Sequence, residues 1–284
     1  MNALTYLLVT FAAVSLVVSI CRAEGTAPAG VAARCPGDVG IESDPAVIFV
    51  ENFESGKLDA WTGGHRRERA RVTDDPANVQ SGRRSLEWAV PVDDTGGHIF
   101  HWLKPGLDKV HARVYWKLAE DWTVTRMHGW GLSAQAPGVS VPGDAGRRAD
   151  GTNKFSCIVD RPHQGLTLYV FHPDQRGVYG DGFRTDFKMV PGRWYCVEVM
   201  QKANTPGERD GEQTLWVDGV QVGHWTDLRL RDVPELRINK VILELYLHEN
   251  KNGLNRCFYD DLVVATEYIG PQVPLEQKGS GQAE

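Results

Sequence analysis

Apolar and polar residues alternate with a period of two along many short stretches of this chain. In the stretch 166–171, Leu168 and Val170 fall on one side of an extended backbone, while Tyr169 and Phe171 fall on the other. Clusters rich in Gly, Pro, Asp and Asn separate such stretches, and no segment keeps a helical period over three turns. The pattern predicts an all-β protein whose short strands form a two-sheet sandwich or a jelly roll.

The two ends of the chain differ from this strand-rich middle. Residues 24–45 are rich in Ala, Gly and Pro, and we interpret them as a flexible leader. Residues 46–271 hold the predicted strands without a linker between them, so we expect a single β domain there. Residues 272–284 are polar and rich in Gly and Gln, and we expect them to form a disordered tail.

The first residues of the chain indicate its destination. The apolar run LLVTFAAVSLVVSI is too short to span a membrane comfortably, and Ala23 follows it at a plausible cleavage position. We therefore predict a signal peptide over residues 1–23 and a secreted or periplasmic mature protein. No association with a membrane is expected after the signal is removed.

Four cysteines remain in the predicted mature chain: Cys35, Cys157, Cys196 and Cys257. An even number of cysteines in an exported protein is typical of disulfides, so we expect two, with all three pairings open. A bond between Cys35 and Cys257 would join the two ends of the domain. The separations between the cysteines are too wide for a zinc ribbon, so no metal site is expected from them.

The charge of the chain bears on its partners. The formal net charge is −6 and the sequence contains no basic tract, so we expect no nucleic-acid partner. A polyanionic ligand is compatible with this charge, because a local basic cleft can lie within an acidic protein.

Three predicted strands carry rings and charged groups on the face opposite their apolar residues. Aromatic rings stack on the apolar faces of sugars, and Arg, Lys, His and Glu bind hydroxyls and carboxylates. If the three strands are neighbours, their polar faces form a glycan-binding groove; the alternative is an ordinary solvated sheet face. The residues on these faces are Arg113, Tyr115 and Lys117, then Tyr169 and Phe171, then Glu244, Tyr246 and His248.

The second half of the chain resembles polysaccharide lyase families 14 and 20. The segments that carry the resemblance are LTLYVFHPDQRGVYG, GRWYCVEVMQKANTPGERDGEQTLWVDG and CFYDDLVVATEYIG, within residues 105–270. The resemblance implies a two-sheet antiparallel β-jelly-roll sandwich of the concanavalin A-like type. It also implies cleavage of a uronate-containing polysaccharide, such as alginate or glucuronan, by β-elimination.

The resemblance extends to individual site residues. The Tyr-x-Tyr motif of these families appears here as Tyr169-Val170-Phe171, and Arg161 matches an Arg that precedes the motif. His128 stands where the families have a catalytic Lys. The resemblance therefore implies that Arg161 neutralises the substrate carboxylate, while His128 and Tyr169 share the base and acid roles.

Two other functions compete with a lyase. A carbohydrate-binding jelly roll would use the same rings without breaking a bond. A glycoside hydrolase would need two carboxyl groups facing one groove, and Glu244 is one candidate without a clear partner. In each case we expect a monomer whose partner is a polysaccharide, and for the lyase an anionic one.

The expected chemistry requires no cofactor. A structural calcium ion is one option, because hard oxygen ligands suit that ion. Its ligands would come from Asp260 and Asp261 together with Glu51 or Glu54. The alternative is that these carboxylates accept hydrogen bonds at turns and strand ends.

Overall fold

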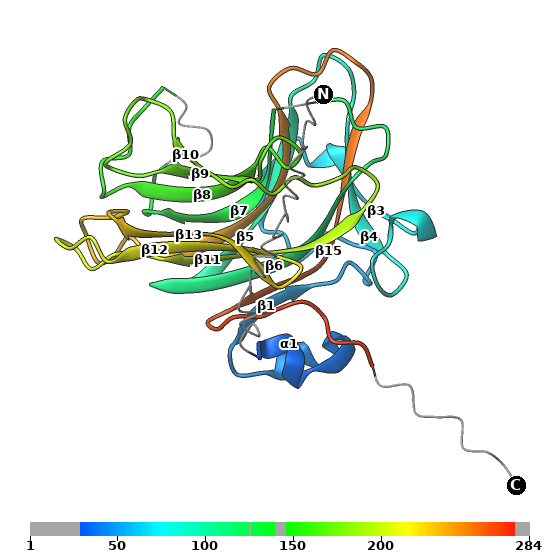
Figure 1. Ribbon diagram of the computed structural model, residues 1–284, viewed down its shortest axis with the longest axis horizontal. Helices are drawn as coiled ribbons and strands as arrows, with labels where there is room; N and C mark the ends of the chain where they lie inside the picture. The colour runs from blue at the N-terminus through cyan, green and yellow to red at the C-terminus, as the bar shows by residue number, and fades with distance from the viewer. Residues whose placement is uncertain (1–28, 125, 140–145, 276–284) are drawn as a thin grey trace, which may run out of the picture.

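The computed structural model describes residues 29–124, 126–139 and 146–275. The predicted signal peptide, residues 1–23, lies outside the described residues. Two antiparallel β-sheets stack face to face as a jelly-roll sandwich, which confirms the predicted fold class. In Figure 1 the green strands β7 to β10 lie above the yellow strands β11 to β13, and α1 lies at the bottom beneath β1.

Eight strands form one sheet within the described part of the chain. Its order is β13-β12-β11-β6-β15-β4-β3, and β1 pairs with the second half of β15. The bounds of these strands are Val220–Leu228 (β13), Gly211–Val217 (β12), Trp194–Lys202 (β11), Lys109–Leu118 (β6), Asn255–Ala265 (β15), Ser85–Val90 (β4), Ala70–Thr73 (β3) and Val47–Glu51 (β1).

Seven strands form the other sheet, in the order β10-β9-β8-β7-β14-β5-β2. The strands far apart in sequence are therefore neighbours, since β14 lies between β7 and β5. The bounds of these strands are Asp181–Arg184 (β10), Thr167–Phe171 (β9), Lys154–Asp160 (β8), Met127–Gln135 (β7), Ile238–Leu247 (β14), Gly96–Leu107 (β5) and Gly63–His65 (β2).

The core lies between the two sheets and follows the predicted alternation. Leu168, Leu245 and Leu247 are fully buried, whereas Tyr246 is 38% exposed on the opposite face of its strand. Because successive strand residues point to opposite faces, the apolar set of each strand meets the other sheet and the polar set faces outward. The faces predicted for β9, which contains Leu168, and for β14, which contains Leu245, Tyr246 and Leu247, are confirmed.

The segment expected to be a flexible leader is folded from residue 29 onward. It forms α1 (Val31–Arg34) and the 3-10 turns η1 (Pro36–Asp38) and η2 (Ile41–Ser43), while two further turns, η3 (Arg67–Arg69) and η4 (Pro76–Asn78), lie elsewhere. Val31 and Ile41 are buried against Val263 and Ile269 near the end of the chain. The leader prediction was wrong for this part, because its few apolar residues cover an apolar patch on the eight-stranded sheet.

The four cysteines are free thiols, so the expected disulfides are absent among the described residues. Cys157 lies in the seven-stranded sheet, whereas Cys196 and Cys257 lie in the other. In the strand register, Cys196 lies opposite Tyr115 and Cys257 lies opposite Leu118. The side chains of Tyr115 and Leu118 point to opposite faces of β6, so those of the two cysteines also lie on opposite faces of the sheet. A disulfide needs closely spaced Cα atoms with converging side chains, which opposite faces of one sheet do not provide.

Among the described residues, no helix is long and apolar enough to cross a membrane.

Candidate functional site

A groove of about 670 Å³ lies on the outer face of the seven-stranded sheet. The sheet positions its lining, because β9, β8, β7, β14 and β5 run side by side beneath it. One end of the groove, here called the histidine end, is formed by His128, Tyr169, Tyr246 and His248. The other, here called the lysine end, is formed by Lys154 and Lys240 together with nearby aromatic rings.

A β-bulge in β7 turns His128 toward the groove. Regular alternation would place His128 on the same face as Trp130, which is fully buried in the core. The pairing with β8 instead shifts register between His128 and Trp130, so that Gly129 is the extra residue. Gly129 faces the core, since a Cβ there would lie 2.6 Å from Cη2 of Trp116. A side chain has no room at this position, and the bulge leaves the imidazole on the outer face.

His128 lies at the centre of the histidine end. Its ring centroid is 5.0 Å from that of Tyr169, 5.5 Å from that of Tyr246 and 5.0 Å from that of His248. The Nε2 atoms of His128 and His248 are 3.0 Å apart, so one donates a hydrogen bond to the other. Burial, and then the charge of His248, lowers the pKa of His128 to about 3. Both rings are therefore neutral at neutral pH, since burial also lowers the pKa of His248 to about 4.

The phenol of Tyr169 is held by the loop between β9 and β10. The backbone N–H of Gly180 donates a hydrogen bond of 3.0 Å to the Tyr169 hydroxyl oxygen. Gln175 is fully buried in this loop, and its amide donates to the carbonyl oxygens of Gly177 and Tyr179. Burial raises the pKa of the Tyr169 phenol, which keeps it protonated at neutral pH. The hydroxyl is therefore oriented and remains a proton donor.

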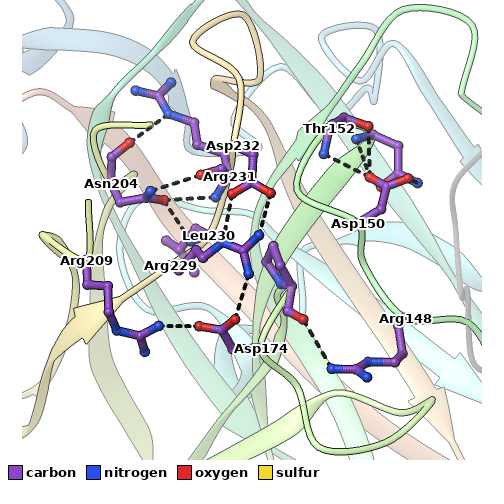
Figure 2. A network of polar contacts seen from close by, with 12 residues as sticks. Arg148, Asp150, Thr152, Asp174, Asn204, Arg209, Arg229, Leu230, Arg231 and Asp232 are labelled. Carbon is purple, nitrogen blue, oxygen red and sulfur yellow. Dashed lines mark hydrogen bonds and ion pairs between the residues drawn. The ribbon is translucent and has the colours of Figure 1, made fainter. Parts of the chain in front are cut away.

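The same loop is tied to the other sheet by the polar network in Figure 2. Asp174 binds Arg209 from the β11–β12 connection and Arg229 from the segment after β13, the latter at 2.8 Å. Arg229 also binds Asp232 through two hydrogen bonds of 2.7 and 2.6 Å. These contacts connect the loop that holds Tyr169 to both layers of the sandwich, so the site is anchored by the whole fold.

Positive charge borders the histidine end. Arg126 lines the groove. Burial is the largest cause of the lowered pKa of His128 and of His248, and the charge of Arg126 lowers both further. Arg161 is not part of the groove lining. Its Nε lies 3.5 Å from Oδ2 of Asp160. Its charge nevertheless also lowers the pKa of His128. Asp160 lies with Oδ1 4.0 Å from Nδ1 of His128. An anionic group bound beside His128 would therefore find a cation, Arg126, in the same groove lining.

Glu244 lies on the floor of the groove. Burial raises its pKa to about 8, and the nearby Asp160 carboxyl contributes. It is the one carboxyl among the described residues that line the groove. Because it is protonated at neutral pH, it does not repel an anionic ligand.

Five of the predicted site residues on β7, β9 and β14 and in the turn after β14 come together in the groove as expected: His128, Tyr169, Glu244, Tyr246 and His248. Phe171 joins them toward the lysine end. The groove also contains residues that the sequence analysis did not single out. One of them, Lys240, lies in β14 with the same parity as Glu244 and Tyr246, so the alternation could have identified it. These additional residues include His65, His98, Phe100, Arg126, Lys154, Tyr179 and Lys240.

The prediction that Arg113, Tyr115 and Lys117 share this groove was wrong. Their strand, β6, belongs to the eight-stranded sheet, so its outward face lies on the opposite side of the sandwich. All three side chains are buried there beneath other segments. Arg113 pairs with Asp38, and the Tyr115 hydroxyl accepts a hydrogen bond of 2.9 Å from the backbone N–H of Gln272.

The carboxylates considered as calcium ligands accept hydrogen bonds. Asp260, Asp261, Glu51 and Glu54 each accept at least one from a neighbouring backbone amide or hydroxyl. In the described parts of the chain, no group of three or more His, Cys, Asp or Glu side chains is arranged to hold a metal ion. Calcium binding by these carboxylates stays a prediction.

Comparison with models of known protein families gives no match, and neither does comparison with curated protein sequences. Solved structures do match. The PL-14 alginate lyase from Aplysia kurodai has a TM-score of 0.64 at 13% identity, over 78% of this chain and 99% of that chain. A mutant of alginate lyase Aly36B in complex with an alginate tetrasaccharide has a TM-score of 0.59 at 18% identity, over 78% and 95%.

The endo-β-1,4-glucuronan lyase from the fungus Trichoderma reesei is similar as well. Its TM-score is 0.57 at 16% identity, over 78% of this chain and 95% of that chain. At these identities the likeness concerns the fold. The chain therefore has the jelly-roll fold of these polysaccharide lyases.

Proposed function

We propose that the protein is a polysaccharide lyase that cleaves a uronate-containing polysaccharide by β-elimination. The observation that carries this proposal is the packing of two neutral imidazoles and a protonated phenol around one point of the groove, beside Arg126. Elimination needs these parts: a group that neutralises the carboxylate, a base for the C5 hydrogen, and an acid for the departing glycosidic oxygen.

Each part has a candidate in the histidine end. Arg126 binds the carboxylate, and Arg161 adds positive charge from its position beside Asp160. The hydrogen-bonded pair of His128 and His248 accepts the C5 proton, and a bound carboxylate favours the imidazolium form by its negative charge. The Tyr169 phenol donates its proton to the glycosidic oxygen that departs. The product carries an unsaturated sugar at its new end.

The test is absorbance near the ultraviolet edge during incubation with alginate, glucuronan and other uronate polymers. We expect the wild type to release an absorbing product from at least one of them. Tyr169→Phe keeps the ring and removes the proton donor, so turnover should fall by about 10²–10⁴-fold while binding of the polymer persists. Phe187→Leu, which changes a ring outside the groove lining, should leave the turnover of this reaction near that of the wild type.

A non-catalytic carbohydrate-binding module is the second candidate. The exposed rings of Tyr179 and Tyr246, at 61% and 38% exposure, favour it because they offer stacking surfaces without any need for catalysis. It predicts binding of the polymer with no absorbing product from any uronate, and no effect of Tyr169→Phe. Release of product that Tyr169→Phe leaves unchanged would retain the lyase class and contradict the role given to Tyr169.

A glycoside hydrolase is the least supported alternative. Hydrolysis needs two carboxyl groups on one groove, and Glu244 is the one carboxyl among the described lining residues.

A further inference from the structure

The loop between β9 and β10 contains a fully buried amide side chain, that of Gln175. Its Nε2 donates a hydrogen bond of 3.0 Å to the carbonyl oxygen of Gly177 and one of 3.1 Å to that of Tyr179. Its Oε1 accepts from the backbone N–H groups of His172 at 3.3 Å and Ala149 at 3.4 Å. These four contacts are all with the backbone, so the side chain fixes the path of the loop.

One of these hydrogen bonds fixes the peptide group that contacts Tyr169. The carbonyl oxygen of Tyr179 and the N–H of Gly180 belong to the same planar peptide group, in which they point in opposite directions. Gln175 binds the carbonyl end, and the N–H end donates its hydrogen bond of 3.0 Å to the Tyr169 hydroxyl oxygen. A hydrogen bond at the carbonyl also polarises the peptide group and strengthens its N–H as a donor. Gln175 thus acts on the phenol through one rigid group.

Gly180 allows this peptide group to lie against the phenol ring. A Cβ at Gly180 would lie 3.1 Å from Cε2 and Cζ of Tyr169 and 2.8 Å from the carbonyl oxygen of Val170. Both distances are shorter than ordinary van der Waals contact, so a side chain at this position would push the backbone away from the ring. A glycine therefore permits the close approach that the hydrogen bond needs.

The proposed reaction turns the Tyr169 phenol into an anion. Its proton passes to the glycosidic oxygen as the C4–O bond breaks, while the C5 proton passes to the histidine pair and the electrons of the C5–H bond form the new double bond. Burial raises the pKa of this phenol, and negative charge on Asp160 and Tyr179 raises it further. The N–H of Gly180 and, less strongly, the charge of Arg126 lower this pKa, because both favour the phenolate.

We infer that the N–H of Gly180, aimed by Gln175, stabilises the phenolate of Tyr169 that forms as the glycosidic bond breaks. Gln175 is then a positioning residue, because it does not line the groove and acts through the peptide group. A backbone N–H directed at an oxygen where negative charge develops works as an oxyanion hole does, here on the acid rather than on the substrate. Proton transfer from the imidazolium of the histidine pair then restores the phenol. This inference rests on the proposed function.

Titration of a fluorinated phenol at position 169 tests the anion stabilisation without any turnover. Tyr169 is replaced by a difluorotyrosine, whose fluorine NMR signal reports the ionisation of this one ring. Gln175→Met keeps the length of the side chain and removes its bond to the Tyr179 carbonyl, so we expect the phenol pKa to rise by about one unit or more. Replacing Gly180 by glycolic acid exchanges only its N–H for an ester oxygen, and should raise the pKa by a similar amount.

The matched control is Gln213→Met, which makes the same substitution at a fully buried glutamine in β12 of the other sheet. The amide of Gln213 has no hydrogen-bond partner among the described residues, so the phenol pKa should keep its wild-type value. An unchanged pKa in the Gly180 ester variant would overturn the inference, even if Gln175→Met fails to fold. A rise with the ester but not with a folded Gln175→Met would overturn the role given to Gln175.

Kinetics separate the positioning role from mere support of the fold. In Gln175→Met we expect kcat to fall about tenfold and KM to stay within about twofold, because the negative charge on the phenol develops only in the transition state. In a Tyr169→Phe background the same substitution should cost no further kcat, because no phenolate forms there. An equal loss in both backgrounds would show that Gln175 only supports the groove, and would overturn its positioning role.

Failure of the anion stabilisation and failure of the proposed function are distinguishable. If the wild type releases no unsaturated product, the proposed function is wrong, and the fluorine titration still decides whether the N–H of Gly180 stabilises the phenolate. If the wild type releases product but neither variant raises the phenol pKa, the proposed function stands and the anion stabilisation is overturned.

Discussion

At the scale of single residues, burial changes the ionisation of the groove more than charged neighbours do. It is the largest cause of the lowered pKa of His128, of the raised pKa of Glu244 and of the lowered pKa of Lys240. Desolvation disfavours the charged form of each group, so bases lose protons easily and the acid keeps its own. The same apolar surroundings thus supply neutral proton acceptors and remove a repulsive carboxylate.

Glu244 makes this effect measurable as stability. Its pKa is about 8 in the folded protein and 4.5 ordinarily, with Asp160 raising it and Lys240 lowering it. Between these values the folded state keeps a proton that the unfolded state has released, so this group's contribution to the free energy of unfolding falls as pH rises from 4.5 to 8. Glu244→Gln has no ionisable group at this position and therefore lacks this loss. We expect the difference in free energy of unfolding between Glu244→Gln and the wild type to be about 1–3 kcal/mol more in favour of the variant at pH 8 than at pH 5. The value is below the full pKa difference because Glu244 keeps some contact with the cavity.

Urea unfolding at the two pH values measures that difference. Glu120→Gln, at an exposed position, is the matched control and should follow the wild type at both. A Glu244→Gln effect of the same size at pH 5 and pH 8 would show that the carboxyl ionises normally in the folded protein.

At the scale of secondary-structure elements, the bulge in β7 decides which face His128 occupies. Gly129 and Trp130 both face the core, so His128 falls on the groove side although its sequence parity is that of Trp130. The bulge also adjusts the pairing with β14, where register shifts between Leu243 and Tyr246. A local irregularity thus aims the imidazole at the neighbouring rings.

Gly129→Ala tests the bulge. The new methyl group would lie 2.6 Å from atoms of the Trp116 ring, which is fully buried, so we expect a loss of about 1–3 kcal/mol in the free energy of unfolding. The proposed lyase activity should fall more than the loss of stability alone explains, because the repacking displaces His128. Ser133→Ala, in the same strand, removes a hydroxyl without a hydrogen-bond partner and should change stability by less than about 0.5 kcal/mol. Equal stabilities for Gly129→Ala and the wild type would contradict the tight packing.

At the scale of the whole molecule, the segment after residue 29 closes the outer side of the eight-stranded sheet. The backbone N–H groups of Val31 and Ala32 donate to the carbonyl oxygens of Tyr268 and Ile269, each at 2.9 Å. Arg113, which is fully buried in β6, reaches this segment through Asp38. The two outer sides of the sandwich thus differ: one is covered by the segment around residues 31–38, and the other carries the groove.

Removing one partner of that buried ion pair should be costly. Asp38→Ala leaves the guanidinium of Arg113 without its carboxylate, so we expect a loss of about 3 kcal/mol in the free energy of unfolding. Asp38→Ala/Arg113→Met removes the orphaned charge and should be more stable than Asp38→Ala alone. Chemical denaturation gives both values, and hydrogen exchange at the amides of Val31 and Ala32 should quicken in Asp38→Ala. A double variant no more stable than Asp38→Ala would show that the orphaned charge of Arg113 is not what costs stability.

The sequence alone predicted what depends on near neighbours in the chain. Alternation between residues i and i+2 placed Leu168 and Leu245 in the core and Tyr169 and Tyr246 on the outer face, because successive side chains of a strand point to opposite sides. The strand-rich pattern also predicted the sandwich. The roles of His128 and Arg161 came from the family resemblance, and the proposals above still await their tests.

Only the tertiary structure decided which strands share a face of the molecule. Arg113 and Tyr169 have the same kind of alternating pattern, yet their strands lie in different sheets, because strand pairing depends on contacts between distant segments. The same long-range packing buried Lys240 beside the groove, turned His128 outward through the bulge and put Cys196 and Cys257 on opposite faces of one sheet. Alternation determines the side of a strand, and packing between distant strands determines what that side faces.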